Sequence, residues 1–448
     1  MYVYVAFLLI ILTYGMETAL FRFTQEDPDQ KDKIYSTSVL SVAATSALFI
    51  LMVALFRNSI AETLRYPDNV EYVLILGVVV GLDALLAIPY ARLRVENKPL
   101  QFAWIRLAGI GVNIGLVLFF LLFCPWLLHS GPEWTRPIVE TIYYPDIGVG
   151  YVFISNLAAT LFTFLLLAPV LRQVRLVFDF HVWQRMMAYS LPLLIAGLAG
   201  WVNEALDKLL LKYMLPEQIA MAQVGIYGAV YKLAVLMTIA VQGFRYAAEP
   251  FFFAEAKGPN AREMFARIMN YFVVACLLIF LGIMLFMPMV KHFIGSNYHE
   301  GLAVVPVLLM AKLFLGVYWN LSIWYKLTDK TRFGAWFAVV GAVITIVLNV
   351  LLIPRYGYHG SAWAALACYF SLALMSYLFG RRYYPVPYDV GKILLLIISA
   401  LAVYGLSHFT IGLQPLFMYP LHVLLVILFI GVSFRIDPDL RSATKLFG

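Results

Sequence analysis

The sequence predicts an all-α membrane protein that crosses the bilayer about thirteen times. The 448 residues are 63% hydrophobic and only 13% charged, whereas soluble domains carry about 25% charged residues. Apolar runs long enough to cross a hydrocarbon core of ~30 Å recur along the whole chain. Lys and Arg gather in every second loop between these runs, as in membrane proteins with a fixed orientation. These three observations exclude a soluble globular fold.

Thirteen apolar runs, with ends uncertain by several residues, are the predicted helices. Every loop between them carries Lys or Arg except the last one, which is a short turn. Pro250 predicts an end or a kink in the longest run. In chain order the runs cover residues 2–23, 36–56, 71–91, 100–128, 148–171, 186–211, 222–253, 265–290, 301–325, 333–353, 359–380, 390–409 and 413–434.

The distribution of Lys and Arg predicts the orientation. Loops on one side of the membrane, together with the C-terminal tail, hold twenty of these residues, and loops on the opposite side hold six. Because cytoplasmic loops are enriched in Lys and Arg, the tail is expected in the cytoplasm. This assignment leaves Met1 outside.

An internal repeat with an offset of 232 residues explains why Met1 is predicted on the outer side of the membrane. The offset places Glu17 on Glu249, Lys98 on Lys330 and the pair 103–104 on 335–336, and it keeps the order of the apolar runs. The helix 186–211 then has no counterpart, so we expect the first helix of the first half to be missing here. The predicted division is a lobe at 1–175, a second six-helix lobe at 176–385, and two additional helices with the tail at 386–448.

Six basic side chains lie inside apolar runs and point to an anionic ligand. Each would cost about 2.5 kcal/mol or more in hydrocarbon, so such residues usually face a polar cavity or a partner. Five acidic residues also lie inside apolar runs, and they are candidates for ion coupling or for internal pairing. The basic residues are Arg22, Arg106, Lys208, Lys232, Arg245 and Lys312, and the acidic ones are Glu17, Asp83, Glu204, Asp207 and Glu249.

Two of these groups have a clear alternative interpretation. Arg22 and Arg245 lie near the cytoplasmic ends of helices that correspond in the repeat, where they either contact an anionic headgroup or extend to the membrane interface. Asn203, Glu204, Asp207 and Lys208 either line a cavity or include a Glu204–Lys208 pair one helical turn apart.

Lys232 and Lys312 are the deepest cations, and neither has an acidic residue within one turn. A cavity position is therefore the favoured interpretation for both. The alternative is a partner from another helix, for which Asp83, Glu204 and Asp207 are the candidates. Arg106 lies nearer the inner end of its run and is compatible with both interpretations.

Motifs for chemistry are few. No GxxxxGK[ST] phosphate loop occurs, which disfavours an ATP-driven pump. The histidines are scattered, so we expect no metal and no cofactor, and nucleic acid is a poor explanation of the net charge of +7. Cys124, Cys276 and Cys368 lie far apart in apolar runs and are interpreted as small buried hydrophobic residues. The loop 129–147 is too short for a separate catalytic domain.

The segments YVAFLLIILTYGMETALFRF (4–23), SLPLLIAGLAGWVNEALDKLLLKYMLP (190–216) and GIYGAVYKLAVLMTIAVQGFRYAAEPFFF (225–253) resemble the multidrug/oligosaccharidyl-lipid/polysaccharide (MOP) exporter superfamily, and within it the polysaccharide flippases. Similar proteins have about fourteen helices in two six-helix lobes around a central cavity. The resemblance implies a transporter without enzymatic activity. It implies flipping of undecaprenyl-diphosphate-linked oligosaccharide across a bacterial inner membrane by alternating access, in lipopolysaccharide O-antigen or other polysaccharide synthesis.

Other functions stay open at this point. A cation-coupled drug exporter and a lipid II flippase share the same superfamily, although six interior cations against five acids argue against an exporter of cationic drugs. A polysaccharide polymerase usually has a large outer loop and a glycosyltransferase a cytoplasmic acidic metal-binding segment; neither feature is seen. The implied partners are the lipid-linked oligosaccharide, membrane lipids and the polysaccharide polymerase machinery.

Overall fold

The computed structural model describes residues 2–440 apart from 97, 176, 257, 329 and 411–413, and its described part is helical without strands. Thirteen of its helices are long and apolar enough to cross a membrane, which confirms the predicted fold class. Within helices, a few side chains lie outside the described part of the chain; these are Tyr2, Ile138, Tyr246, Ala247, Glu249, Pro250 and Ala254.

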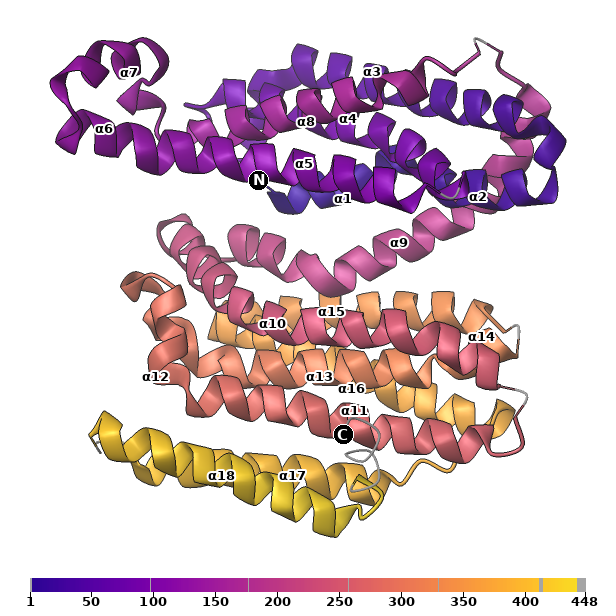
Figure 1. Cartoon of the computed structure of the whole chain (residues 1–448), viewed down its shortest axis with the longest axis vertical. Helices are drawn as coiled ribbons and strands as arrows, with labels where there is room; N and C mark the ends of the chain where they lie inside the picture. Colours follow the sequence, from indigo (N-terminus) through magenta and orange to yellow (C-terminus); the bar gives the residue numbers. More distant parts are fainter. Residues whose placement is uncertain are drawn as a thin grey trace. The chain divides into compact units, whose positions relative to one another are not determined.

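Contacts divide the chain into two compact units, Met1–Leu198 (unit 1) and Ala199–Gly448 (unit 2). The boundary falls within one long helix, whereas the sequence analysis expected a division at 175/176, which stays a prediction. Figure 1 shows each unit as a set of long helices lying side by side. Each unit is described by itself below.

Unit 1 contains α1 (Tyr2–Thr13), α2 (Met16–Glu26), α3 (Lys31–Thr63), α4 (Val70–Val95), α5 (Pro99–Leu118), α6 (Cys124–Ser130), α7 (Arg136–Ile142), α8 (Gly150–Leu171) and the first part of α9 (Phe180–Met214). Helix α4 is central, because α1, α2, α3 and α8 all pack on it, and α5 packs on α8. The short α7 lies in the predicted 129–147 loop.

The predicted first helix is interrupted between α1 and α2. Gly15 has φ +75°, a left-handed conformation that glycine adopts without steric cost. A Cβ atom on Gly15 would lie 3.1 Å from the backbone oxygen of Ser190 in α9, so the break also allows a close approach of two helices. Hydropathy alone predicted one uninterrupted helix here, because the residues on both sides of Gly15 are apolar.

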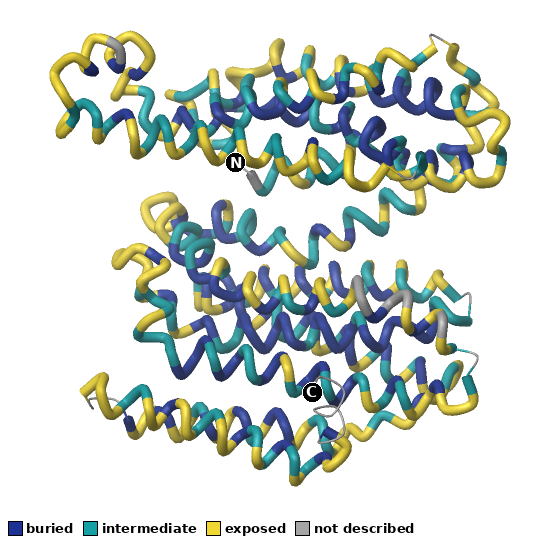
Figure 2. The backbone as a smooth tube through the Cα atoms, in the orientation of Figure 1, coloured by how far each residue is buried: buried dark blue, intermediate teal, exposed yellow. Residues whose placement is uncertain are grey.

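Helix α5 is the most exposed span of unit 1. Together with the π-helical turn Phe119–Phe123 and α6, it forms a span of 32 residues, and only 6% of its most apolar window is buried. Figure 2 shows α5 mostly as exposed or intermediate, and Leu107 of α5 and Leu122 of the π-helical turn are more than 60% exposed. Exposed leucines along a helix of this length are expected where the surrounding solvent is lipid.

An ion-pair network ties the basic ends of the unit 1 helices together. Arg92 of α4 donates to Glu96 at 2.7 Å and to Asp32 of α3 at 3.2 Å, and it lies over the Tyr35 ring. Lys98 also pairs with Glu96 at 2.7 Å. This network lies on the side of the membrane that carries most Lys and Arg.

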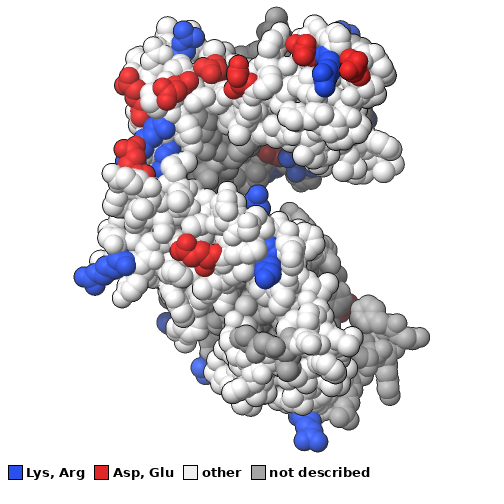
Figure 3. Space-filling model, turned by 90° about the vertical axis from the view of Figure 1, so that its left-hand side faces the viewer, with Lys and Arg blue, Asp and Glu red and all other residues white. Residues whose placement is uncertain are grey.

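The charge asymmetry is visible on the opposite side of the molecule. Figure 3 looks at the side that carries α6 and α7, and in its unit 1 part acidic side chains are more prominent than basic ones. Most of the remaining surface in this view is uncharged. The loop count assigns six Lys and Arg to this side and twenty to the other, which stays a prediction of orientation.

Unit 2 continues from α9 with α10 (Glu217–Glu255), α11 (Ala261–Leu285), α12 (Met287–Val290), α13 (Val305–Leu321), α14 (Ile323–Leu327), α15 (Arg332–Tyr356), α16 (Tyr358–Tyr383), α17 (Val390–Ser407) and α18 (Pro415–Ile436). The sequence predicts an end or a kink at Pro250. Helix α10 continues to Glu255, so it does not end there. A single residue, Gly357 with φ +56°, separates α15 from α16.

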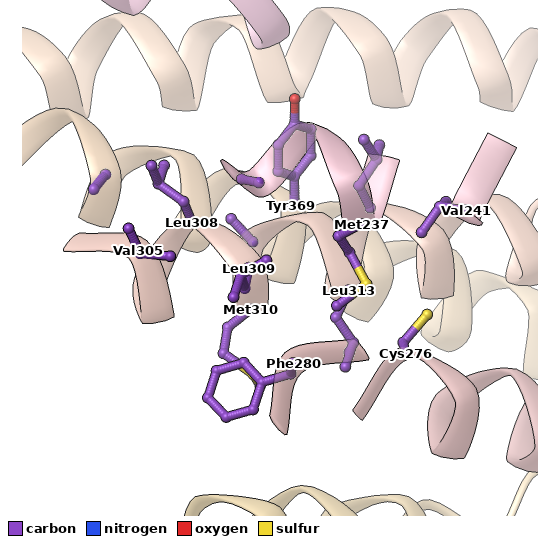
Figure 4. Packing of buried hydrophobic residues seen from close by; sticks show 14 of the residues in the cluster. Met237, Val241, Cys276, Phe280, Val305, Leu308, Leu309, Met310, Leu313 and Tyr369 are labelled. Carbon is purple, nitrogen blue, oxygen red and sulfur yellow. The ribbon is translucent and has the colours of Figure 1, made fainter. Parts of the chain in front are cut away.

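The core of unit 2 lies around α13. Figure 4 shows Met237 and Val241 of α10, Cys276 and Phe280 of α11, and Leu309 of α13 packed together. In the span that contains α13, 72% of the most apolar window is buried, the highest share among the described spans. Cys276 is buried and unpaired, as are Cys124 and Cys368, which confirms their interpretation as small apolar residues.

The two units repeat one succession of helix contacts. In unit 1, α3 packs on α4, α4 on α8, and α8 on α5; in unit 2, α11 packs on α13, α13 on α16, and α16 on α15. The offset of 232 residues carries α3, α4 and α5 onto α11, α13 and α15. For these three helices the packing agrees with the repeat predicted from the sequence, whereas α8 and α16 correspond in their contacts and not by the offset.

The two last helices join unit 2 through α11. Helix α17 packs on α11 and α18. Beyond the end of α18, the buried carboxylate of Asp437 accepts a hydrogen bond from Asn270 of α11 at 2.7 Å and lies 3.7 Å from the ammonium group of Lys392 in α17. One side chain thus links three helices at the basic side of the membrane.

Candidate functional sites

Unit 1 contains a partly open cavity of about 560 Å³ along its helices, a volume typical of small-molecule sites. Most of its lining comes from one face each of α4, α5 and α8, because the lining residues recur three or four positions apart. We call it the unit 1 cavity. Its lining is Leu9, Glu17, Asp83, Leu86, Ala87, Tyr90, Arg94, Phe102, Arg106, Gly109, Ile110, Asn113, Asn156, Ala159, Thr160 and Thr163.

Small side chains keep this space open. Ala87, Gly109 and Ala159 contribute one lining residue each from α4, α5 and α8. A Cβ atom on Gly109 would lie only 2.5 Å from the hydroxyl oxygen of Thr163, so α5 and α8 approach closely beside the cavity. Larger residues at these positions would fill the space that the polar side chains line.

The charged groups lie at different depths. Counted from the start of α5 at 1.5 Å per residue, Arg106 is about 10 Å deep and Asn113 about 21 Å deep. Glu17 of α2 pairs with Arg94 near the basic ends of the helices. Asp83 lies deeper and accepts a hydrogen bond from Thr160 at 3.2 Å.

Arg106 is the cation that the unit 1 cavity leaves available. Its guanidinium lies 5.4 Å from the centre of the Tyr90 ring, and within the described residues no carboxylate comes within 4.0 Å of it. At the deep end, the buried side-chain oxygen of Asn113 has no hydrogen-bond partner in this structure. The cavity can therefore bind an anion in its middle and a hydrogen-bond donor further in.

Unit 2 gathers its polar side chains into a packed cluster instead. We call the following residues of α9, α10, α13 and α16 the unit 2 polar cluster: Asn203, Glu204, Asp207, Lys208, Tyr227, Tyr231, Lys312 and Tyr369. Asn203 donates to the backbone oxygen of Ala338 at 3.1 Å, accepts from Thr345 at 3.3 Å, and its backbone oxygen accepts from the Tyr369 hydroxyl at 3.0 Å. These bonds fix α9 against α15 and α16.

The two acids of the cluster differ in their surroundings. Asp207 is 6% exposed and accepts from the Tyr227 hydroxyl at 2.6 Å and from the backbone N–H of Lys208 at 2.8 Å. The side chain of Glu204 is 53% exposed and lies 3.5 Å from the ammonium group of Lys312. The sequence named Glu204 among three candidate partners of Lys312, and it also allowed a Glu204–Lys208 pair.

Lys312 is the most buried cation of the described chain, with 2% of its side chain exposed. Its ammonium group lies 4.9 Å from the centre of the Tyr231 ring and 5.5 Å from that of Tyr369. Lys208 approaches the same Tyr231 ring to 3.9 Å. The ammonium groups of Lys208 and Lys312 thus share one aromatic neighbour. The negative face of the Tyr231 ring attracts each of them through a cation–π interaction.

The other predicted residues do not join either group. Arg22 is exposed, pairs with Glu26 at 2.7 Å and lies over the Tyr189 ring. Arg245 is exposed and lies 4.6 Å from the centre of the Trp319 ring. Lys232 is exposed on a face of α10 that also exposes Leu236 and Ile239.

The side chain of Glu249 lies outside the described residues. Of the eleven predicted site residues, Glu17, Asp83 and Arg106 meet at the unit 1 cavity, and Glu204, Asp207, Lys208 and Lys312 meet in the unit 2 polar cluster.

Sequence reasoning missed several residues of both groups. Arg94 was assigned to a loop, although it pairs with Glu17 at the cavity. Asn113 and Thr160 carried a usable signal, since a polar side chain in the middle of an apolar run needs a partner. Tyr227 and Tyr231 carried none, because the chain has 28 tyrosines.

Neither group has the composition of a metal site. Within the described residues, no three His, Cys, Asp or Glu side chains lie close enough to hold a metal ion. What the two groups share is a cation held within membrane-spanning helices beside polar and aromatic side chains. A multi-pass helical fold with such an interior is compatible with a membrane transport protein.

Comparison with solved structures identifies this fold. The chain is similar to the lipid II flippase MurJ in an inward closed conformation, with 15% identity, 98% of this chain and 92% of that chain covered, and a TM-score of 0.67. It is also similar to an inward-facing multidrug resistance MATE transporter of the MOP superfamily, with 15% identity, coverage of 85% and 87%, and a TM-score of 0.66.

A third similar structure is a MOP superfamily transporter from Pyrococcus furiosus with a binding pocket of reverse polarity, at 14% identity, 85% coverage of both chains and a TM-score of 0.57. None of the curated proteins matches the sequence. Residues 1–131 match a family described as polysaccharide biosynthesis protein. This match and the shared fold support the predicted resemblance to the polysaccharide flippases of the MOP superfamily.

Proposed function

We propose that this protein flips an undecaprenyl-diphosphate-linked oligosaccharide from the cytoplasmic to the outer leaflet of a bacterial inner membrane, by alternating access. The oligosaccharide would serve O-antigen or other cell-surface polysaccharide synthesis. The observation that carries the proposal is Arg106, a cation without a carboxylate partner at a 560 Å³ cavity within membrane-spanning helices. The match of residues 1–131 to a polysaccharide biosynthesis family supports the same substrate class.

The proposed substrate explains why cations lie in the spans. A diphosphate headgroup leaves water only if polar groups replace its hydration, and an Arg guanidinium or a Lys ammonium forms strong hydrogen bonds to phosphate oxygens. No bond has to be made or broken, so the process needs no catalytic residue. Arg106 in unit 1, and Lys208 and Lys312 in unit 2, would each contact the diphosphate during transport.

The remaining predicted residues have narrower proposed roles. Arg22 and Arg245 would attract the headgroup near the cytoplasmic surface, and Lys232 would face water rather than lipid during transport. Glu17 and Asp83 would balance the charge of the unit 1 cavity. The twenty-to-six distribution of Lys and Arg supports a cytoplasmic C-terminus. The polysaccharide polymerase machinery would take up the translocated product.

A second candidate substrate is lipid II. It is favoured by the similarity to the lipid II flippase MurJ, which extends over 98% of this chain. The drug-exporter alternative is less favoured, because an exporter of cationic drugs needs an acidic cavity, whereas the unit 1 cavity is lined by two acids, Glu17 and Asp83, and by two cations, Arg94 and Arg106.

Complementation tests the proposal. A strain that lacks its own O-antigen flippase receives the chain, and lipid-linked oligosaccharide is measured in each leaflet. We expect export to be restored by the chain and lost with Arg106→Gln. Arg57→Gln, which removes an exposed cation of α3 outside both groups, is the matched control. Restored export by Arg106→Gln at normal expression would contradict the proposed site, and rescue of a lipid II flippase-deficient strain instead would favour the second candidate.

A further inference from the structure

The unit 2 polar cluster contains one acid, Glu204, that pairs with a cation and one, Asp207, that a hydroxyl and a backbone N–H hold. Asp207 is buried and is held by two hydrogen bonds from Tyr227 and Lys208. Glu204 has a side chain that is 53% exposed, and its one hydrogen bond in the described structure is the 3.5 Å contact with Lys312. Movement of Glu204 away from Lys312 therefore breaks one long ion pair, whereas movement of Asp207 breaks two shorter bonds.

The protonated form of Lys312 needs an anion beside it. Its side chain is 2% exposed, and removing the partner of a buried charge costs about 3–5 kcal/mol. The neighbouring aromatic rings of Tyr231 and Tyr369 stabilise the ammonium group but do not neutralise it. Whatever displaces Glu204 must therefore bring a negative charge of its own.

Lys208 makes the position suitable for a ligand with two anionic groups. Both ammonium groups lie near the centre of the Tyr231 ring, at 3.9 Å for Lys208 and 4.9 Å for Lys312. The two ammonium groups are therefore less than about 9 Å apart, the sum of the two distances. With hydrogen bonds of about 2.8 Å at either end, the oxygens of one diphosphate can reach both.

We propose that Glu204 is an internal counter-ion that occupies Lys312 in the empty protein and that the diphosphate of the substrate displaces. This inference rests on the proposed function, and it names the residue that competes with the substrate. The exchange keeps Lys312 paired before and after binding, so the buried cation is never left alone. The released carboxylate of Glu204 returns to water at its exposed position, and it repels the bound diphosphate during release.

Titration of the purified full chain in lipid nanodiscs with inorganic pyrophosphate tests this role. Glu204→Gln removes the competing charge and keeps the shape, so we expect pyrophosphate to bind about tenfold more tightly, a difference of ~1.4 kcal/mol. Lys312→Gln is expected to bind about tenfold more weakly than the unchanged protein. In the Lys312→Gln background the added Glu204→Gln should have no effect, because the competition has no target. Glu263→Gln, an exposed carboxylate of α11, is the matched control.

The outcomes separate this inference from the proposed function. If the unchanged protein binds pyrophosphate and Lys312→Gln weakens it, but Glu204→Gln does not strengthen it, Glu204 is no counter-ion and the function stands. Glu204 is equally excluded as a counter-ion if Glu204→Gln strengthens binding to the same extent in the Lys312→Gln background. If no variant binds pyrophosphate, the proposed function itself fails. Lys312→Arg, which keeps the charge, serves where Lys312→Gln does not fold, and it should retain the Glu204→Gln effect.

Discussion

Unit 1 and unit 2 place their helices in the same succession of contacts, but one interior is open and the other is filled. On the offset of 232 residues, Gly109 corresponds to Gly341 and Asn113 to Thr345. In unit 1 these positions border the cavity. In unit 2 a Cβ atom on Gly341 would lie 3.0 Å from the side-chain nitrogen of Asn203, and Thr345 donates to the same amide.

The difference teaches that side-chain volume, and not helix arrangement, decides what each interior can hold. Small residues such as Ala87 and Ala159 leave room for a ligand in unit 1. Tyrosines 227, 231 and 369 occupy the interior of unit 2, and they are buried or partly buried. Arg106 in the open interior of unit 1 can pair with an anion from outside the protein. Lys312 in the filled interior of unit 2 is already paired with Glu204.

Loss of transport is the largest expected effect and the most direct test of the comparison. Arg106→Gln and Lys312→Gln should each reduce translocation of lipid-linked oligosaccharide about 10-fold to 100-fold, because each removes a charged partner from an apolar region. The double variant should be inactive. Measurement in proteoliposomes with a leaflet-specific label checks this. A defect with only one of the two variants would assign the substrate to that unit alone.

Removing one hydroxyl from each interior should give the next largest effects. Tyr227→Phe removes the 2.6 Å hydrogen bond that the Tyr227 hydroxyl donates to buried Asp207. It should lower the free energy of unfolding by about 1.5–3 kcal/mol, the range for hydrogen bonds to charged groups. Thr160→Val removes the 3.2 Å hydrogen bond that Thr160 donates to Asp83, but water in the cavity can replace it. We therefore expect a loss of about 0.5–1.5 kcal/mol in the free energy of unfolding. Unfolding in mixed micelles measures both; equal losses would contradict an open unit 1 interior.

Alanine substitution of the corresponding glycines should also destabilise the protein more in unit 2 than in unit 1. Gly341→Ala brings a Cβ atom against Asn203, which two hydrogen bonds hold in place, so we expect a loss of about 1–2 kcal/mol. Gly109→Ala should change stability by less than ~1 kcal/mol, because Thr163 can turn its hydroxyl into the cavity. Gly282→Ala, which meets open space on α11, is the control and should be neutral or stabilising. The reverse order would mean that the unit 1 cavity is filled in solution.

The smallest expected effect is a pH dependence confined to unit 1. Burial raises the pKa of Glu96, but hydrogen bonds from Lys98 and Arg92 outweigh it, so the pKa lies below its ordinary value. The stabilisation is complete above the unfolded pKa of about 4.3 and is lost as the pH falls through the lower folded pKa. Thr328 stands at the corresponding position of unit 2.

Melting curves of the unchanged protein and of Glu96→Gln between pH 3 and 7 check this expectation. The two melting temperatures should differ at pH 7, by a shift that corresponds to less than ~1 kcal/mol, and converge as the pH falls through the lowered folded pKa of Glu96. A difference that persists at pH 3 would mean that the substitution acts through packing and not through the charge.

Sequence patterns predicted the spans but not the contacts between them. Length and hydropathy were sufficient for thirteen spans, and the repeat correctly predicted a shared packing scheme. The interruption at Gly15 escaped hydropathy, because it changes backbone direction without changing polarity. The sequence placed Lys312 in the interior, but Glu204 lies 108 positions away, and one sequence contains no signal that selects it over Asp83 or Asp207.

Asp437 has a practical consequence for anyone who handles this protein. Its carboxylate holds Asn270 and Lys392, so the segment just after α18 is part of the framework rather than a free tail. Shortening the chain ahead of this residue would leave the amide of α11 and the lysine of α17 without their shared acceptor. Reporter proteins and purification handles are therefore best joined beyond residue 440, where they leave that junction intact.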